Sequence, residues 1–261
     1  MKEATKAWGL IGEKAGTSPY ADALEEKTVA LPGVSPDSCL VETLYGSWEG
    51  NMDHALRADP VNVCSQRKEA EIILGNSAVV RVLAPGETSG FAEGDLCLIY
   101  GAAETDKFGF PTLALAYDAP GTSGVLARRL VLPAANLLPV PGNTGYDVKR
   151  WASFSIRYIT AWGSLNVAVK AFRSQIGERD LPALNIGAWG GGTSYAEITL
   201  AKLRGHMPFL VTSDGPRLEQ LGQEAITGID RRTFMDLDFD EARYDSEHGY
   251  RENYSAQEEI Y

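Results

Sequence analysis

Past its middle, the chain changes its pattern of hydrophobic and polar positions. Residues 20–150 carry short apolar segments between turn-forming residues, without long helical stretches. The clearest of these segments are residues 39–45, 72–83, 95–100 and 124–132. The runs between them, such as APGETSG and PVPGNTG, are rich in Gly, Pro, Ser and Asn, which favour turns. The pattern predicts a β-rich unit of barrel or sandwich type.

The spacing of apolar residues becomes helical from about Val148. It predicts one long helix over residues 148–173, with an apolar face that consists of Trp151, Phe154, Ile159, Trp162, Val169 and Phe172. We therefore place the domain boundary near residues 141–150 and predict two domains, residues 1–147 and residues 148–261.

The second domain shows strand-like and helical segments in alternation. The strand-like runs cover residues 184–188, 209–212 and 226–229, and the helical ones cover residues 195–205 and 216–224. This alternation is typical of an open parallel sheet with helices packed on it. The expected fold class is thus α/β with a β-rich N-terminal domain.

A glycine-rich turn follows the first of these strand-like runs. Gly190, Gly191 and Gly192 stand between that run and the next helical segment. The order of strand, glycine turn and helix is how a dinucleotide-binding domain begins, because glycine lets the backbone approach a pyrophosphate. A complete sheet of this kind takes about six strands. The residues from Thr193 onward suffice for roughly half of such a sheet.

The charge of the chain narrows the choice of partners. The formal net charge is -11, which argues against a nucleic-acid-binding groove, because phosphate backbones attract Lys and Arg. Nine acids and two arginines lie between Met235 and Tyr261, so this segment alone contributes -7. We interpret the segment as a solvated surface, with a docking surface for a partner as the alternative.

The cysteines and the apolar runs indicate in which cellular compartment the protein is expected. Cys39, Cys64 and Cys97 are odd in number and far apart, and they predict neither a disulfide framework nor a zinc-cysteine cluster. Reduced, buried thiols in a cytoplasmic protein are therefore expected. The N-terminus has no apolar core of signal-peptide length. Because no run of about 18 apolar residues occurs, we expect no membrane partner.

In their order and spacing, several segments resemble the medium-chain dehydrogenase/reductase superfamily, which contains zinc alcohol dehydrogenases, quinone reductases and enoyl reductases. The segments are ILGNSAVVRVLAPGETSGFAEGDLCL, LVLPAANLLPVP, YITAWGSL and the glycine turn with its helix, and the resemblance covers roughly residues 25–232. It implies a GroES-like β-barrel followed by a Rossmann domain, here a partial one, with the site in the cleft between them.

The positions of the zinc ligands in this family carry other residues here. Glu49 stands in the place of the metal-binding cysteine, and the Gly-His-Glu motif reads Gly-Asn-Ser at residues 75–77. The third ligand would fall near Ser155 or Ile156. One carboxylate without a thiolate or an imidazole does not make a catalytic zinc site, and the four-cysteine loop of the structural zinc is missing too. The resemblance implies a zinc-free member, of the kind that reduces activated C=C or quinone bonds by hydride transfer.

The resemblance also implies a nucleotide cofactor at the glycine turn. Trp189 takes the place of the first glycine of the motif and Ser194 that of the third, whereas Gly191 and Gly192 remain. The middle glycines are those that let a pyrophosphate approach the backbone. We expect Trp189, Gly191, Gly192 and Thr193 to contact the cofactor.

The type of cofactor depends on the end of the second strand. An acid there would favour NAD, because it would hydrogen-bond the ribose 2′-hydroxyl. The matching position is Thr212 or Ser213, with Arg217 close behind, and serine with arginine suits a 2′-phosphate. NADP is therefore favoured over NAD, although Asp214 would reverse this preference in a shifted register. Thr160 matches the threonine that packs close to the nicotinamide in this family.

Glu49, Asn51, Asn76 and Tyr158 are the candidate catalytic residues. Between two domains Glu49 would be partly desolvated and suited to proton transfer. The alternative is a carboxylate that is salt-bridged to Arg157 or hydrogen-bonded to Asn51. Asn51 and Asn76 would orient a substrate carbonyl or simply satisfy buried polar groups. Tyr158 would be a proton donor on the helix that lines the family's cleft, or a core residue.

Three hypotheses for the function follow. The first is an NADPH-dependent, zinc-independent reductase of an activated C=C bond in an enoyl thioester, an enone or a quinone. The second is a redox-neutral isomerase, lyase or cyclase that uses Glu49 as acid and base. The third is a non-catalytic or partner-completed protein, in which another chain or segment covers the open edge of the partial Rossmann sheet. The expected partners are a small-molecule substrate and either a second copy of the chain or that completing segment.

Overall fold

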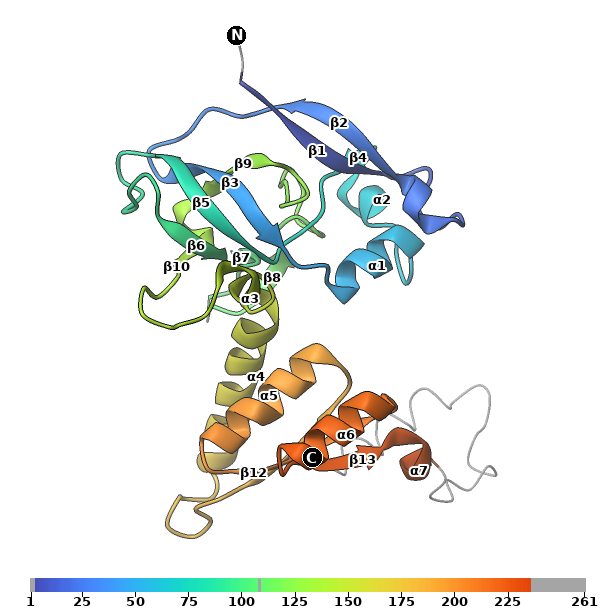
Figure 1. Cartoon of the computed structure of the whole chain (residues 1–261), viewed down its shortest axis with the longest axis vertical. Coiled ribbons are helices and arrows are strands. Elements are labelled where there is room, and N and C mark those ends of the chain that lie inside the picture. Colours follow the sequence, from blue (N-terminus) through green and yellow to red (C-terminus); the bar gives the residue numbers. More distant parts are fainter. Residues whose placement is uncertain (1–2, 108, 236–261) are drawn as a thin grey trace. The chain divides into compact units, whose positions relative to one another are not determined.

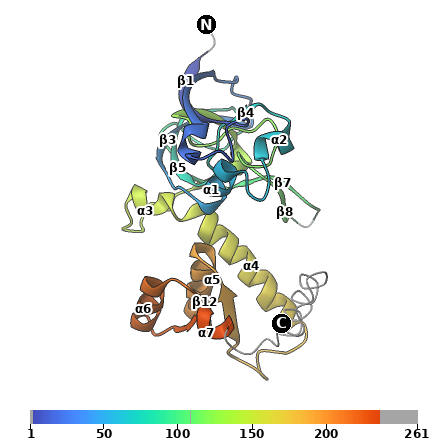
Figure 2. The ribbon, with the colours of Figure 1, turned by 90° about the vertical axis from the view of Figure 1, so that its right-hand side faces the viewer.

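The chain forms two compact units, Met1–Ile159 and Thr160–Tyr261, as seen in a computed structural model that describes residues 3–107 and 109–235. Helix α4 (Ser155–Arg173) begins in the first unit and ends in the second (Figure 1). The first unit is built mainly of strands, and the second alternates strands with helices (Figure 2). This mixed α/β organisation with a β-rich first part confirms the expected class.

The first unit contains two main antiparallel sheets and a hairpin. The larger sheet has the order β10 (Leu137–Pro139), β6 (Leu96–Ile99), β5 (Ala78–Pro85), β3 (Ser38–Gly46) and β9 (Arg129–Pro133). The smaller sheet has the order β2 (Leu24–Ala30), β1 (Ala4–Ile11) and β4 (Glu71–Ile72), and the hairpin joins β7 (Ala102–Thr105) to β8 (Pro111–Ala114). Neighbouring strands that are not consecutive in the chain, such as β3 and β9, indicate long-range crossovers.

Alternation along the strands explains the core of the larger sheet. In β3 the side chains of Cys39 and Val41 point to one side, and Val80 and Val82 of β5 meet them in the same buried cluster. Backbone hydrogen bonds join the two sheets: the N–H of Trp8 donates to the Leu126 carbonyl at 2.9 Å, next to a bridge between β1 and the segment before β9. Closure of this kind leaves fewer exposed strand edges.

Two short helices cover the smaller sheet. Helix α1 (Gly50–Arg57) and helix α2 (Val63–Arg67) bury Met52 and Val63 in a cluster with Leu10 of β1 and Ile72 of β4. Each side chain is at most a few per cent exposed. Packing on this sheet fixes the start of α1, which directly follows Glu49.

The predicted strand over residues 72–83 is wrong, because the chain leaves the sheet in its middle. Strand β4 ends at Ile72 and β5 begins at Ala78. Gly75 between them has φ +104°, a conformation that breaks a strand and that side-chain-bearing residues rarely adopt. A Cβ at Gly75 would also lie 2.8 Å from the Val125 side chain. The predicted strand at residues 124–132 likewise begins only at Arg129.

The described part of the second unit contains a parallel sheet, with the strand order β11 (Asn185–Trp189), β12 (Met207–Thr212) and β13 (Thr227–Asp230). Helices α5 (Gly192–Leu203) and α6 (Gly215–Gln223) connect the strands, and α7 (Arg231–Met235) follows the last one. Ile198, Leu210, Leu221 and Ile226 form the core. The predicted alternation of strands and helices is confirmed.

The predicted long helix over residues 148–173 is interrupted. Helix α3 (Val148–Ala152) ends where the Ser153 hydroxyl donates to the Arg150 carbonyl, and α4 begins at Ser155. The predicted apolar face is wrong for Trp162, which is 57% exposed, whereas Ala161 and Leu165 are buried. Small and branched residues at helical spacing form the packed stripe, and the larger aromatic ring points outward.

The two units separate later in the chain than the expected boundary at residue 147. Ala152 of α3 is buried together with Val79 and Leu98 of the larger sheet, and Trp151 and Phe154 pack against them. These contacts attach α3 and the residues that lead into α4 to the first unit. The division therefore falls between Ile159 and Thr160.

The acidic segment from Met235 to Tyr261 lies, beyond Met235, outside the described residues. In the part of the chain that is described, no helix combines the length and the apolar character that crossing a membrane requires.

Gly75→Ala is expected to destabilise the first unit by about 1–3 kcal/mol, because a Cβ meets both an unfavourable φ and the Val125 side chain. The matched control is Gly50→Ala at the start of α1, where a Cβ would meet nothing within 4 Å. Urea unfolding followed by circular dichroism measures both changes. Equal midpoints for the two variants would contradict this account of the interrupted strand.

Candidate functional site

Polar residues from three segments of the first unit form a closed circuit of contacts, which we call the polar ring. Its members precede or begin α1, stand just before β5, or lie in the first turn of α4. They are Glu49, Asn51, Asn76, Ser77, Ser155 and Arg157.

Three contacts close the polar ring. The Nε of Arg157 donates to Oε2 of Glu49 at 2.9 Å. The Nδ2 of Asn51 donates to Oδ1 of Asn76 at 3.3 Å. The hydroxyls of Ser77 and Ser155 are hydrogen-bonded at 3.0 Å. Because each remaining gap spans at most two residues of sequence, all six lie in one small region.

The polar ring contains buried polar atoms that have no hydrogen-bond partner among the described residues. Glu49, Asn76, Ser77 and Ser155 are all buried, and the Ser77 hydroxyl also contacts the Ala152 carbonyl at 3.0 Å. Three atoms have no hydrogen bond to any described residue: Oε1 of Glu49, Oδ1 of Asn51 and Nδ2 of Asn76. Buried polar groups are nearly always hydrogen-bonded, so two acceptors and a donor left over in one region mark the polar ring as a candidate site.

The structure brings together three of the four predicted catalytic residues, Glu49, Asn51 and Asn76. Glu49 is salt-bridged to Arg157, which is one of the alternatives the sequence left open for it, whereas Asn51 bonds Asn76 instead of Glu49. Sequence reasoning considered Arg157 only as a counter-ion. Its position on the first turn of α4, next to Ser155, was the available signal.

The fourth predicted catalytic residue, Tyr158, belongs to an aromatic stack beside the polar ring. Its ring lies parallel to that of Phe154, with centroids 4.6 Å apart, and Phe154 meets Trp151 edge-on at 4.9 Å. Tyr158 directly follows Arg157 in α4, so the stack runs from Trp151 of α3 to the first turn of α4.

In residues 3–107 and 109–235, no three His, Cys, Asp or Glu side chains lie close enough together to hold a metal ion. The polar ring contains a single carboxylate. The three thiols are buried elsewhere in the first unit, and burial raises the pKa of Cys97 to about 12. A protonated thiol is a poor metal ligand.

In the second unit, the glycine turn bends at Gly190, one residue after the position that corresponds to the first glycine of the motif. Trp189 is the last residue of β11, and Gly190 makes the tight turn with φ +130°. The N–H of Gly190 donates to the Val211 carbonyl at 3.2 Å, and the Ser194 hydroxyl donates to the Trp189 carbonyl at 2.9 Å. The turn therefore needs no glycine at Trp189, and the serine closes it.

The start of α5 is open. Gly191 is the N-cap residue, no side chain caps the helix, and a Cβ at Gly191 would meet nothing within 4 Å. Thr193 is exposed in the first helical turn, next to Gly192. The backbone N–H groups of such a helix start and the positive end of its dipole favour a bound anion.

The residues predicted to select the cofactor lie after β12. Ser213 is exposed, and the Asp214 carboxylate accepts from the N–H of Arg217 at the start of α6. The Arg217 guanidinium lies 4.2 Å from the centre of the Tyr195 ring and donates to Gln220 at 2.8 Å. Arg217 is thus held between α6 and α5.

Tyr195 is the centre of this contact between α5 and α6. Its hydroxyl is within 2.6–2.7 Å of both carboxylate oxygens of Glu224, and burial, together with that carboxylate, raises the pKa of Tyr195 to about 12. The remaining predicted cofactor residue, Thr160, is exposed on α4 at the start of the second unit. Sequence reasoning missed Arg231, whose guanidinium lies 5.6 Å from the Trp189 ring centre.

Comparison with solved structures shows the fold. The crotonyl-CoA carboxylase/reductase AntE in complex with NADP is 22% identical, with a TM-score of 0.67 over 88% of this chain and 58% of AntE. The 2-octenoyl-CoA carboxylase reductase CinF from Streptomyces sp. is 18% identical, with a TM-score of 0.68 over 88% of this chain and 60% of CinF. CinF also matches as a complex with NADP and 2-octenoyl-CoA. The quinone oxidoreductase from Coxiella burnetii is 17% identical, with a TM-score of 0.65 over 88% of this chain and 63% of its own.

This is the medium-chain dehydrogenase/reductase fold. The resemblance seen in the sequence is thereby confirmed at the level of the fold. The chain spans about three fifths of the length of these structures. No protein-family model and no curated protein sequence matches it.

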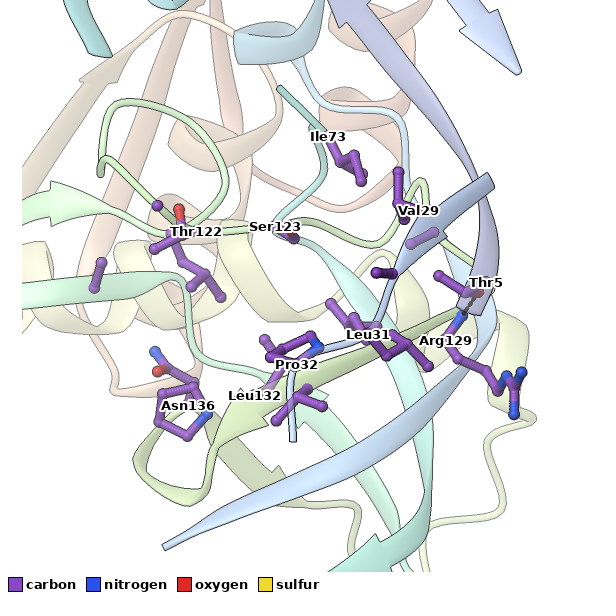
Figure 3. Close-up of a pocket in the computed structure, with 18 residues that line it drawn as sticks. Thr5, Val29, Leu31, Pro32, Ile73, Thr122, Ser123, Arg129, Leu132 and Asn136 are labelled. Atoms are coloured by element: carbon purple, nitrogen blue, oxygen red, sulfur yellow. Dashed lines mark hydrogen bonds between the residues drawn. The ribbon is translucent and has the colours of Figure 1, made fainter. Parts of the chain in front are cut away.

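A pocket of about 250 Å³ lies elsewhere in the first unit, against β9 and the end of β2 (Figure 3). Val29, Leu31 and Leu132 line it, and the N–H of Arg129 donates to the Thr5 hydroxyl at its edge at 2.9 Å. None of the predicted site residues lines this pocket. The polar ring and the start of α5 remain the candidate sites.

Arg157→Leu is expected to lower the free energy of unfolding by on the order of 2–3 kcal/mol, because Glu49 would stay buried without its counter-ion. This is below the ~3–5 kcal/mol typical of a fully buried pair, since the Arg157 side chain is 36% exposed. Adding Glu49→Gln to this variant should restore part of the loss. Denaturant unfolding of both singles and the double gives the coupling energy, and strictly additive effects would exclude a stabilising pair.

Proposed function

We propose that the chain is an NADPH-dependent, zinc-independent reductase of an activated C=C bond, built from a GroES-like barrel and the first half of a Rossmann domain. The observation that carries the proposal is the open start of α5, where Gly190 and Gly191 leave the first helical turn accessible at the end of a parallel strand. Anionic dinucleotides bind at such helix starts.

The residues of the second unit fit the nucleotide in several respects. Gly191, Gly192 and Thr193 would hold the pyrophosphate by backbone and hydroxyl groups, and Trp189 would flank it. Ser213 and Arg217 would bind the 2′-phosphate of NADP, and Thr160 would pack near the nicotinamide. Arg217 would keep its stacking on Tyr195 and use its other N–H groups for the phosphate. When bound, NADPH would supply the hydride.

The polar ring fits the other half of this chemistry. Reduction of an α,β-unsaturated carbonyl compound moves negative charge onto the carbonyl oxygen, and donors in a buried polar site stabilise that charge. Asn51, Asn76 or a backbone amide would orient the oxygen. Glu49 or Tyr158, or a water molecule, would deliver the proton that completes the saturated product.

The solved structures support this proposal by their ligands. AntE was solved with NADP, and CinF with NADP and 2-octenoyl-CoA. An acyl thioester is therefore the first substrate class to test, with enones and quinones next. Because the chain spans only about three fifths of these proteins, a second copy or a further segment that completes the parallel sheet is part of the proposal.

A second candidate function is a redox-neutral isomerase, lyase or cyclase. It is favoured by one observation: Oε1 of Glu49 is buried and has no partner among the described residues, as a carboxylate awaiting a substrate proton would be. Glu49→Gln would abolish such an activity, whereas NADPH would have no effect on the rate.

NADPH is expected to quench the tryptophan fluorescence of the chain at micromolar concentration, because Trp189 ends the strand that leads into the glycine turn. Trp189→Phe should remove most of the signal while leaving binding, measured by calorimetry, intact. No response to NADPH or NADH by either method would exclude the reductase proposal.

Gly191→Val supplies the structural test of the same site. A Cβ at Gly191 would meet nothing within 4 Å, so the added atoms occupy the open space at the helix start. NADPH affinity should fall at least tenfold, and the thermal midpoint of the variant is measured alongside to show that it is folded. Gly222→Ala near the end of α6, where a Cβ also meets nothing within 4 Å, is the control and should bind normally.

Arg217→Gln is expected to weaken NADPH binding roughly tenfold or more and to leave NADH binding unchanged, because a charge-assisted contact to the 2′-phosphate contributes ~1.5–3 kcal/mol. Calorimetric titration of both nucleotides measures the difference. An equal loss for both would mean that Arg217 acts only by fastening α6 to Tyr195, and the NADP preference would need another source.

A further inference from the structure

Arg157 has hydrogen-bonding capacity that its ion pair does not use. Its Nε donates to Glu49 at 2.9 Å, whereas neither terminal nitrogen donates a hydrogen bond to another residue in the described part of the chain. A guanidinium carries five N–H groups in a planar fork. Four of them are therefore available to a planar oxygen-bearing group.

The two side chains of the Glu49–Arg157 ion pair differ in their exposure to solvent. The Glu49 side chain is 8% exposed and the Arg157 side chain 36%. The carboxylate is thus the more deeply buried partner, and the arginine side chain is the more accessible one. The partnerless atoms of Asn51 and Asn76 differ in this respect, since each has almost no accessible surface. Arg157 is the donor of the polar ring that an incoming molecule can reach.

The surroundings of Arg157 suit an anionic molecule with a flat conjugated group. Lys149, Arg150 and Arg157 lie within nine positions of α3 and α4, and the carboxylate of the neighbouring Asp147 caps α3. This segment is basic although the chain as a whole has a net charge of -11. The stacked rings of Phe154, just before α4, and Tyr158, in its first turn, stand on either side of Arg157 in the sequence. A local basic patch attracts anionic ligands.

We propose that Arg157 binds the carbonyl oxygen of the substrate, with Glu49 as its positioning residue. The inference rests on the proposed reductase function and deepens it by naming the donor to the substrate carbonyl, with anionic α,β-unsaturated acyl thioesters as the substrate class. Addition of hydride to the β-carbon moves the π electron pair toward the carbonyl, which becomes an enolate oxygen. Arg157 stabilises that oxygen until a proton reaches the α-carbon, and the products are the saturated carbonyl compound and NADP+.

The charge on Arg157 takes the place of a Lewis acid at this position. A positive group fixed next to a carbonyl oxygen polarises it before the reaction and stabilises the negative charge that develops. Because Nε is held by Glu49, the fork keeps one orientation, and little reorganisation is needed when charge appears.

The test uses trans-cinnamoyl-CoA with NADP+, so that no turnover occurs. The conjugated thioester absorbs in the near ultraviolet, and a charged donor at its carbonyl oxygen shifts the absorbance maximum to longer wavelength. The wild-type chain is expected to produce this shift, and Arg157→Gln to lose it. Arg128→Gln removes an arginine of the first unit whose side chain is 77% exposed and lies outside this basic segment, and this variant should keep the full shift. No shift with the wild type, or an equal shift with Arg157→Gln, overturns the inference.

Two further variants separate position from charge. Arg157→Lys should give a smaller shift, because an ammonium retains the charge but not the fork. Glu49→Gln should keep a shift, with weaker binding of cinnamoyl-CoA, because Arg157 is present but less well held. If Glu49→Gln removes the shift completely while Arg157→Gln retains it, the roles proposed for the two residues are wrong. The double variant Glu49→Gln/Arg157→Gln has no unpaired buried charge and covers the case in which Arg157→Gln does not fold.

Turnover and nucleotide binding keep this inference separate from the proposed function. With crotonyl-CoA and NADPH, Arg157→Gln should lower kcat by about 10²–10³-fold, as expected for loss of a donor to a developing oxyanion, and change KM far less. NADPH titration of the same variant should match the wild type. Normal NADPH binding without an Arg157-dependent shift overturns the role of Arg157 alone, whereas absence of NADPH binding to the wild type overturns the reductase.

Discussion

A carboxylate buried at the start of a helix requires a counter-charge, and this requirement shapes the first unit. Glu49 precedes α1 at a point fixed by the packing of Met52 on the smaller sheet. Its partner Arg157 is the third residue of α4. The ion pair therefore holds the beginning of α4 against the entry to α1, and the neighbouring hydrogen bonds of the polar ring follow from that arrangement. An unpaired buried charge would cost far more than the pair contributes.

Much of the fold could be predicted from periodicity, since side chains in a strand or helix alternate between core and solvent in regular ways. The β-rich first part and the three parallel strands follow from this. The interruption at Gly75 does not, because it depends on how closely Val125 approaches the backbone. Which face of α4 is buried could not be predicted from the sequence either. Apolar residues occur on several sides of this helix, so their spacing does not show that Leu165 is packed and Trp162 is exposed.

The candidate site shows a similar division. Glu49, Asn51 and Asn76 could be assigned to one candidate site from the resemblance to the dehydrogenase/reductase superfamily, before any distance between them was known. What the sequence left undecided was the partner of each polar group, because hydrogen bonds between distant segments depend on geometry within a few tenths of an ångström. At the glycine turn, the same limit explains why Gly190, and not the residue before it, makes the bend.

Burial of the thiols has a practical consequence for chemistry on this chain. All three cysteines are buried and free of disulfides, and loss of water raises the pKa of Cys64 and, to about 12, that of Cys97. Alkylating reagents and oxidants act on accessible thiolates, and burial keeps these three sulfurs away from such reagents. A cysteine introduced at an exposed position would thus react selectively with a spectroscopic label, without prior removal of the native three.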